Sequence, residues 1–531
     1  MSELSLSDPV LMGAVSKIDL RSERQVDVDK LLETFVDTGV VAQLNNRNHQ
    51  IFFGRRGTGK THVLRVLEQR LRADPHNTVV YIDARTLGSS AQFSDDSKPL
   101  RIRCLALFRD ILYPVKDALL ERVVATAPAR SEEALEGLRE LESSIHAPTV
   151  KQYATDRTAT KTSTETNEGA FSLGLTKAGV SLDTGLQSLA SSQDETKYRI
   201  ETEDKVVFPA LHDSLSRVLT LAETTAYILI DEWSTLPAEV QPYLAEFLKR
   251  GVLPNNQAVV KIAALEYRSH FRTSRGVGLE LGADISLTLH LDDYFVYDKS
   301  PEDVSQSLAS MLYKHLSIGL PPNYLAENGI ADASDLQTKL FTERKIFREL
   351  ARASEGVARD FINIFNKAYF DAKKRQRNSI DRAAVIAAAR TWFEQDKSQS
   401  LGDEQHRVLE AIVTQVIGAK KARSFLVPRE LQNHPVLQGL FDARVVHLVQ
   451  RGYADKDNPG VRYDIYTLDY GTYVDLIGTS KQPELNYQFH SESDESDLVV
   501  PFDDKRSIRR IILPATVLEA AERLRLPRGD S

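Results

Sequence analysis

The residues with the clearest potential for chemistry lie between Gly54 and Thr61, where the sequence reads GRRGTGKT and fits G-x-x-x-x-G-K-[ST]. This pattern is typical of a phosphate-binding loop (P-loop), in which glycines let backbone N–H groups approach and wrap a polyphosphate. We expect Lys60 to reach the β- and γ-phosphates of ATP and the Thr61 hydroxyl to ligate Mg²⁺. The predicted nucleotide-binding set is Gly54, Arg55, Arg56, Gly57, Thr58, Gly59, Lys60 and Thr61.

A second chemical signal is an acidic pair, Asp231 and Glu232, which directly follows the apolar run Tyr227–Ile230. A buried strand would place Asp231 at the edge of a sheet, where its carboxylate can hold the Mg²⁺ shell. Glu232 lies one residue further and can polarise the water that attacks the γ-phosphate. The two motifs together predict an ATPase in which Glu232 and Lys60 are catalytic, while Asp231 and Thr61 hold the metal.

The segments around these motifs predict an α/β fold. Strands are expected at 51–53, 79–83, 226–230, 259–265 and 285–291, and helices at 25–44, 61–71, 100–125 and near 205–222. Strands that are apolar on both faces and alternate with helices indicate a parallel sheet that is covered on both sides.

This combination of motifs resembles the AAA+ and related P-loop ATPases that have a catalytic glutamate. The resemblance implies a five-stranded parallel sheet in which 259–265 lies between the P-loop strand and the strand that ends at Asp231. Such enzymes often carry a polar sensor after that additional strand; Asn or Thr is usual there, and this chain has Glu266. An arginine of one AAA+ subunit often completes a neighbour's site, which implies a homo-oligomer with Arg268 and Arg272 both as candidates.

Residues 300–400 are predicted to be mostly helical. Within them, Gly356 and Arg359 open an apolar-faced helix. This arrangement resembles the second-sensor helix in the lids of the AAA+ origin-recognition (ORC/CDC-like) initiators. The resemblance implies that Arg359 reaches the γ-phosphate from the lid and takes part in catalysis.

Residues 403–480 show the order of a winged helix, in which three helices precede a two-stranded wing. The helices are expected at Gln405–Ile417, from Val427–Leu431 onwards and at Leu440–Arg451, with a returning strand at Tyr463–Leu468. The third helix would present Arg444, His447 and Arg451 to double-stranded DNA. Residues 403–478 nevertheless hold nine Lys or Arg and ten Asp or Glu, whereas a strong DNA reader normally has a basic face. DNA and a protein partner therefore both remain open.

The predicted parts are an ATPase core at 1–299, a helical lid at 300–400, a winged-helix-like domain at 403–480 and a tail at 481–531. The core contains an insertion at 150–200 that is rich in Ser, Thr and Gly, with a hairpin expected around Lys177–Gly179. This insertion is either an arm that contacts a partner or a surface insertion without a specific role.

Bulk composition narrows the class of protein. Of the 531 residues, 42% are hydrophobic and 27% charged, as in ordinary folded proteins. No apolar run reaches the ~18–20 residues that span a bilayer, and the N-terminal sequence lacks the pattern of a secretory signal. The single cysteine, Cys104, excludes an intrachain disulfide, and the net charge of −8 argues against a chain built wholly to coat nucleic acid. We expect a cytoplasmic protein with no membrane partner.

The sequence therefore predicts an AAA+ molecular switch that binds ATP and Mg²⁺, hydrolyses ATP with slow turnover and is coupled to a winged-helix domain. Association with double-stranded DNA through 403–480 is one function. The alternative is a signalling or defence-type ATPase whose C-terminal domain and insertion bind protein.

The P-loop motif generates a direct prediction. Lys60→Ala should abolish tight ATP binding, because it removes the loop cation that is placed to reach the terminal phosphates. Isothermal calorimetry with ATP measures the effect, with Lys98→Ala outside the motif as the control. Wild-type affinity in the Lys60 variant would contradict the assignment of the loop.

Overall fold

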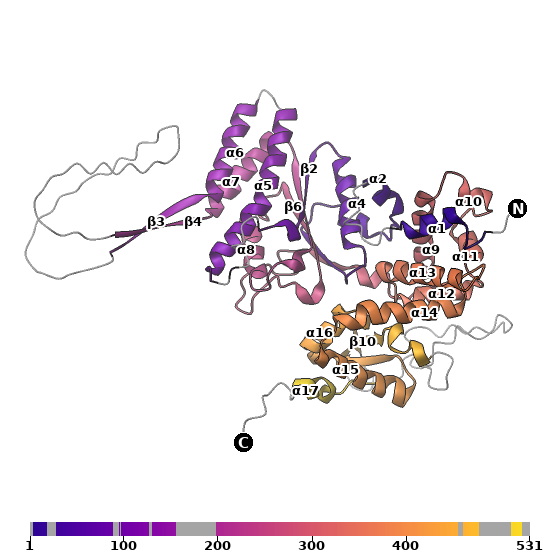
Figure 1. Ribbon diagram of the computed structural model, residues 1–531. Helices are drawn as coiled ribbons and strands as arrows, with labels where there is room; N and C mark the ends of the chain where they lie inside the picture. The colour runs from indigo at the N-terminus through magenta and orange to yellow at the C-terminus, as the bar shows by residue number, and fades with distance from the viewer. Residues whose placement is uncertain are drawn as a thin grey trace, which may run out of the picture.

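The computed structural model describes residues 4–18, 28–88, 95, 97–126, 130–154, 198–454, 460–476 and 511–522. Figure 1 shows an α/β core, a helical region beside it and a C-terminal unit below both.

The centre of the core is a five-stranded sheet in the order β2-β5-β6-β1-β7, and all neighbouring strands are parallel. The strands are β1 Gln50–Phe53, β2 Asn77–Asp83, β5 Thr225–Asp231, β6 Ala258–Ala264 and β7 Leu287–His290. The prediction that 259–265 lies between the P-loop strand and the acidic strand is confirmed, because β6 pairs with both β1 and β5.

Helices cover both faces of this sheet (Figure 1). One face carries α2 Val28–Thr34, α3 Val40–Leu44 and α4 Lys60–Arg72, and the other carries α5 Leu100–Thr126, α6 Ser131–Ile145, α7 Phe208–Leu221 and α8 Gln241–Gly251. Alternate residues of one strand serve opposite faces: Leu229 packs in the cluster under α4, and Ile228 and Ile230 pack in the cluster under α5. This double burial explains why the strands read as continuous apolar runs.

The single helix predicted at 25–44 was wrong within the described residues. The chain forms two short helices, α2 and α3, and Gly39 interrupts them with a left-handed φ of 86°. Glycine adopts this conformation without the steric cost that a side chain would bring.

The insertion leaves the core as a two-stranded antiparallel ribbon, β3 Ala147–Ala154 paired with β4 Tyr198–Lys205. The ribbon continues outward from α6 and α7 (Figure 1). The hairpin predicted around Lys177–Gly179 lies outside the described residues.

Beyond β7 the chain forms the helical region, here called the lid. Its helices are α9 Pro301–Gly319, α10 Tyr324–Glu327, α11 Ala333–Leu340, α12 Arg344–Ala353, α13 Ala358–Lys374 and α14 Arg382–Trp392. The N-terminal helix α1 Pro9–Ser16 also packs here, since Leu11 and Val15 belong to the same hydrophobic cluster as Leu312 of α9. Across the described ranges, no helix combines the length and apolarity that a membrane crossing requires.

The C-terminal unit, residues 403–476 and 511–522, contains α15 Asp403–Val413, β8 Ser424–Pro428, α16 Pro435–Asp442, β9 Val446–Ala454, β10 Arg462–Leu468 and α17 Ala515–Glu522. Its strands form an antiparallel sheet in the order β8-β10-β9. Helix, strand, short turn, helix and two strands form a winged-helix-like order.

Two helices predicted in this unit were wrong. Residues 427–431 finish β8 and form a 3₁₀ turn, Arg429–Leu431, and the next helix begins only at Pro435. The helix expected at Leu440–Arg451 ends at Asp442, and Arg444 has a left-handed φ of 61°. The following valines are β-branched, which favours a strand, and the segment pairs with β10 as β9.

The lid and the C-terminal unit share one hydrophobic core. Phe361 and Phe365 of α13 belong to the same buried cluster as Ile412 of α15, Leu440 of α16 and Tyr466 of β10. The two faces of the core sheet form separate clusters. The packing therefore joins lid and C-terminal unit more closely to each other than to the core.

A buried group of charges crosses the same junction. Lys397 Nζ lies 3.0 Å from Asp360 Oδ2 of α13 and 2.5 Å from Asp469 Oδ2 of the C-terminal unit. All three side chains are almost fully buried. Burial opposes the charge of Lys397, but the two carboxylates outweigh it and raise the pKa of the ammonium above its usual value. Lid and C-terminal unit are thus held by a shared cation.

Removing this cation should destabilise the junction strongly. Lys397→Met is expected to lower the free energy of unfolding by about 3–5 kcal/mol, because it leaves the buried Asp469 carboxylate without its cation. Urea denaturation measures the change. Lys374→Met, at the exposed end of α13, is the matched control and should shift stability by less than about 0.5 kcal/mol. Equal effects in the two variants would contradict a role for the buried cation.

Candidate active site

The P-loop connects β1 to α4 as the sequence predicts. Gly57 and Gly59 have φ angles of 85° and 92°, in the left-handed region that favours glycine. A Cβ on Gly57 would lie 2.6 Å from Cβ of Arg359, so the close approach of the lid also requires a glycine. Gly59 caps α4 without a side-chain hydrogen bond, which leaves the first N–H groups of the helix directed at the loop.

Lys60 is the first residue of α4 and is buried. Its Nζ donates to the carbonyl oxygens of Gly54 at 2.9 Å and Arg55 at 3.1 Å. Burial lowers the pKa of Lys60, while the charges of Glu232 and Asp231 oppose that shift. The structure therefore brings the predicted lysine and both predicted acids into electrostatic range of one another.

Asp231 is the last residue of β5 and is fully buried. Its Oδ1 accepts from the backbone N–H of Glu232 at 2.8 Å, and its Oδ2 accepts from the Tyr81 hydroxyl at 2.7 Å. Glu232 has a φ of 54°, an unfavourable backbone conformation for a residue with a side chain. Strain of this kind concentrates at functional sites, where the surrounding structure holds it in place.

Two residues of this site were missed by the sequence reasoning. Tyr81 of β2 bonds Asp231, and Asp292 accepts from the backbone N–H of Arg55 at 2.9 Å and from Arg55 Nε at 2.7 Å. Both lie at the carboxyl ends of strands of the parallel sheet, which was the available signal, because such ends line the ligand crevice in open α/β sheets.

The lid contacts the P-loop directly. The backbone N–H of Arg359 donates to the carbonyl oxygen of Gly57 at 3.1 Å, at the start of α13. Burial is the main cause of the lowered pKa of Lys60, and the charge of Arg359 makes a smaller contribution in the same direction. The start of α13 therefore lies against the P-loop.

The C-terminal unit contacts the same loop through Arg55. One guanidinium nitrogen of Arg55 is hydrogen-bonded to Nδ1 of His447, and the guanidinium lies 5.6 Å from the ring centroid of Phe441. Burial and the charge of Arg55 lower the pKa of His447 to about 4. His447 is therefore neutral and accepts from Arg55 at Nδ1, while its Nε2 donates to Asp469 at 3.0 Å.

The two arginines considered for a shared site have partners in their own chain. Arg268 Nε lies 2.5 Å from Asp442 Oδ2 of α16, and Arg272 lies 3.3 Å from Glu280. Arg268 also lies close to Arg56 of the P-loop. Partial burial lowers the pKa of Arg56, and the charge of Arg268 lowers it further.

Glu266 pairs with Arg451 of β9 at 2.6 Å and with His290 at 3.6 Å. Burial opposes its charge, but these two partners outweigh burial and keep the pKa of the carboxyl below its usual value. Glu266 thus joins the core to the C-terminal unit, an arrangement different from a free polar sensor.

The side chains predicted to read DNA are paired within the chain, and Arg444 and His447 are buried. Arg444 pairs with Asp360 at 3.2 Å, His447 with Arg55, and Arg451 with Glu266. The prediction of a third helix that reads DNA was wrong, because these residues belong to β9 and to the turn before it. Both segments face the core and the lid. The helix that is present, α16, has the sequence PVLQGLFD and contains no Lys or Arg.

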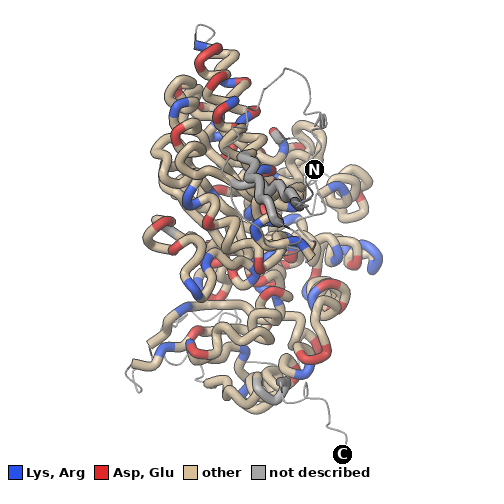
Figure 2. Tube along the Cα trace, turned by 90° about the vertical axis from the view of Figure 1, so that its left-hand side faces the viewer, with Lys and Arg blue, Asp and Glu red and all other residues tan. Residues whose placement is uncertain are grey.

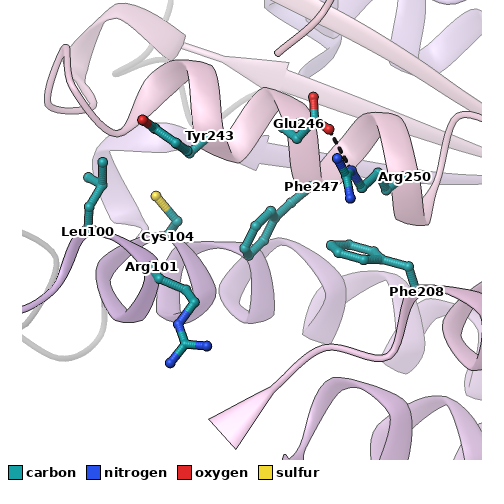
Figure 3. Close-up of a pocket in the computed structure, with 8 residues that line it drawn as sticks. All are labelled: Leu100, Arg101, Cys104, Phe208, Tyr243, Glu246, Phe247 and Arg250. Carbon is teal, nitrogen blue, oxygen red and sulfur yellow. Dashed lines mark hydrogen bonds and ion pairs between the residues drawn. The ribbon is translucent and has the colours of Figure 1, made fainter. Parts of the chain in front are cut away.

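A surface hollow of about 320 Å³ lies on the other side of the sheet, between α5, the start of α7 and α8 (Figure 3). Phe208, Tyr243 and Phe247 line it, and burial raises the pKa of the Cys104 thiol at its wall to about 12. A thiol with so high a pKa is a poor nucleophile, and the lining contains no residue of the P-loop.

Comparison with known proteins agrees with this geometry. The ORC-CDC6-like family model matches residues 20–310, more than half of the chain. The chain belongs to the ORC-CDC6-like family. The match includes the P-loop, Asp231, Glu232 and all five strands of the core sheet. No curated protein matches the sequence.

Solved structures that match this chain include ORC2 of Aeropyrum pernix as ADPNP–ADP complexes, at 13% identity and a TM-score of 0.36, covering 87% of this chain and 94% of that one. ORC1 of Aeropyrum pernix in complex with DNA follows at 12% identity and a TM-score of 0.32, with 86% and 93% covered. The RuvB Holliday junction branch migration motor of Thermotoga maritima has 10% identity and a TM-score of 0.30, with 73% and 76% covered.

The position of Glu232 directly after β5 predicts a role in ATP hydrolysis. Glu232→Gln should retain ATP binding and lower the hydrolysis rate on the order of 10²-fold or more, as expected for the loss of a positioned base. A phosphate-release assay measures turnover. Glu223→Gln, an exposed carboxylate before the opposite end of β5, is the control. Unchanged turnover in Glu232→Gln would assign the base to another residue.

Proposed function

We propose that this protein is an ATP-hydrolysing molecular switch that passes its nucleotide state to the winged-helix-like C-terminal unit. The observation that supports this most strongly is that two other parts of the chain contact the P-loop. Gly57 accepts from the backbone of Arg359 in the lid, and Arg55 bonds His447 in the C-terminal unit. A polyphosphate that reshapes the loop must act on both contacts.

ATP binding would use the N–H groups of the loop and the first turn of α4, together with Lys60. The Lys60 ammonium has three donors, and two of them go to the carbonyl oxygens of Gly54 and Arg55. Terminal phosphates carry a full negative charge, so they compete well for these donors.

The donor set fits Mg²⁺. The Thr61 hydroxyl at the start of α4 and the buried Asp231 carboxylate are oxygen ligands, which this cation prefers. Among the described residues no group of three or more His, Cys, Asp or Glu forms a metal site, as expected where the protein supplies one or two ligands and phosphates supply others. When bound, Mg²⁺ neutralises charge that develops on the phosphates. Glu232 would accept the proton of the attacking water.

The coupling would follow from packing. Because lid and C-terminal unit share one hydrophobic core and the buried Lys397 cluster, we propose that they move as one body. ATP held between core and lid would then set the orientation of the C-terminal unit.

Self-association is part of this proposal. ATP-dependent contact between copies is the setting in which Arg268 or Arg272 would complete a neighbour's site. Arg268 would have to leave Asp442 of its own chain to do so, and this exchange would loosen α16 from the core.

Family membership makes double-stranded DNA the first partner to test. Because α16 lacks cations and Arg444 and Arg451 are paired internally, binding would require other side chains or an undocked C-terminal unit. Segments of Lys and Arg (blue) and of Asp and Glu (red) are interspersed over the trace in Figure 2. The composition of α16 favours a second candidate, in which the C-terminal unit docks on a protein.

Fluorescence anisotropy with a labelled DNA duplex separates the two candidates. Binding through phosphates should weaken steeply between about 50 and 200 mM salt, because counterions are released. DNA-associated function predicts such binding with a non-hydrolysable ATP analogue and weaker binding with ADP. Absence of salt-dependent binding in both nucleotide states would favour the protein-docking candidate.

The lid contact predicts discrimination between ATP and ADP. Arg359→Ala should weaken ATP binding about tenfold more than ADP binding, since a charge-assisted bond to the γ-phosphate contributes about 1.5–3 kcal/mol and ADP lacks that group. It should also flatten any ATP-dependent change in protease sensitivity at 395–405. Calorimetry with both nucleotides and limited proteolysis measure the two effects.

Arg348→Ala, an exposed arginine on the neighbouring helix α12, is the control and should change neither readout. Equal weakening of ATP and ADP in Arg359→Ala would show an ordinary structural arginine and would count against the switch.

A further inference from the structure

The Asp231 carboxylate is held at both oxygens. The backbone N–H of Glu232 donates to Oδ1 at 2.8 Å, and the hydroxyl of Tyr81 donates to Oδ2 at 2.7 Å. The side chain of Asp231 is fully buried, so solvent provides no alternative partner. Each carboxylate oxygen retains a further lone pair, which leaves Asp231 able to accept from, or coordinate, one more group on each side.

Tyr81 is placed for this bond by the sheet. In the parallel pair of β2 and β5, Tyr81 lies opposite Leu229, and Asp83 lies opposite Asp231. Residues two apart on a strand share a face, so Tyr81, Leu229 and Asp231 all lie on the face that α4 covers. The phenol of Tyr81 therefore reaches along this face to the carboxylate at the end of the neighbouring strand.

The ring of Tyr81 is held in turn by the P-loop helix. The guanidinium of Arg65 lies 3.4 Å from the ring centroid, a cation–π contact, and Arg65 also pairs with Glu68 at 2.9 Å. Arg65 follows Thr61 by four residues on α4, so the two side chains project from the same face of the helix. Tyr81 thus links the helix that carries Thr61 to the strand that carries Asp231.

The hydroxyl of Tyr81 acts only as a donor to this acid. The phenol O–H donates to Asp231 Oδ2, because a carboxylate oxygen can only accept. The remaining lone pairs of both carboxylate oxygens stay available to a metal ion.

We infer that Tyr81 is a positioning residue for the metal at the proposed ATP site, where its hydroxyl fixes the orientation of the Asp231 carboxylate that, with Thr61, would hold Mg²⁺. The inference rests on the proposed function and concerns a residue outside both sequence motifs. Partners that orient metal-ligating carboxylates typically change metal affinity about 10–100-fold when they are lost. Nucleotide binding without metal depends on the P-loop and should not require Tyr81.

The test measures metal affinity and metal-free nucleotide affinity separately, and it needs no ATP turnover. The affinity of the full chain for a fluorescent ATP analogue is measured over a range of free Mg²⁺ concentrations, starting from a chelator. In Tyr81→Phe, the Mg²⁺ concentration that gives half of the metal-dependent gain in affinity should rise about tenfold. The affinity in the chelator should stay within about twofold of wild type.

Tyr227→Phe is the matched control. Tyr227 lies on the same face of the sheet, near the opposite end of β5, so the same loss of a phenol hydroxyl there should leave the Mg²⁺ dependence unchanged. A second variant, Arg65→Met, keeps the Tyr81 hydroxyl but removes the stacked cation. It should shift the Mg²⁺ dependence in the same direction by a smaller factor.

An Mg²⁺ midpoint in Tyr81→Phe equal to that of wild type would overturn the inference and leave the proposed function standing. Loss of ATP binding in the chelator would also overturn it, because Tyr81 would then be a structural residue of the whole site. Failure of the wild-type chain to bind the analogue at any Mg²⁺ concentration would overturn the proposed function, and the inference with it.

Discussion

The guanidinium of Arg55 is the contact on which the arrangement of core, lid and C-terminal unit depends. It is buried, it pairs with Asp292 at 2.7 Å after β7, and it bonds His447 of β9. A guanidinium offers five donors in a planar fork and stays charged in a protein, so it can satisfy several partners at once in a fixed geometry. Because Arg55 belongs to the P-loop, the same side chain lies beside the proposed ATP site and anchors the C-terminal unit.

From Arg55 the contacts continue and return to the loop. His447 donates to Asp469, Asp469 and Asp360 share Lys397, and Asp360 adjoins Arg359, whose backbone donates to Gly57. Buried ion pairs of this kind contribute little net stability compared with apolar packing, because desolvation offsets the attraction. They do tolerate few alternative geometries. This closed series of contacts, which begins at Arg55 and ends at Gly57, therefore adds little stability. Its role is to specify one arrangement of core, lid and C-terminal unit.

This arrangement also explains why cations of the C-terminal unit do not mark a DNA-reading face. Arg444 and Arg451 serve as counter-ions to Asp360 and Glu266, and α16 turns its apolar residues Leu440 and Phe441 inward. Tyr267 of the core packs edge-on against Phe441 at 5.1 Å. The C-terminal end of α16 is thus held against the core.

The sequence by itself determined the P-loop and the acidic strand end, because each depends on residues adjacent in the chain. The place of 259–265 between their two strands was implied by the resemblance to AAA+ ATPases. Glycines at fixed spacing, a lysine at a helix start and apolar runs of strand length act locally. It did not determine that residues 446–451 form a strand, since apolar runs of that length fit a helix equally well until a partner strand such as β10 is available. Only the tertiary structure decided the partners of Arg55, because His447 lies 392 residues away. It likewise decided that Tyr81 completes the bonding of Asp231, since the two lie on neighbouring strands 150 residues apart and no local pattern records that pairing.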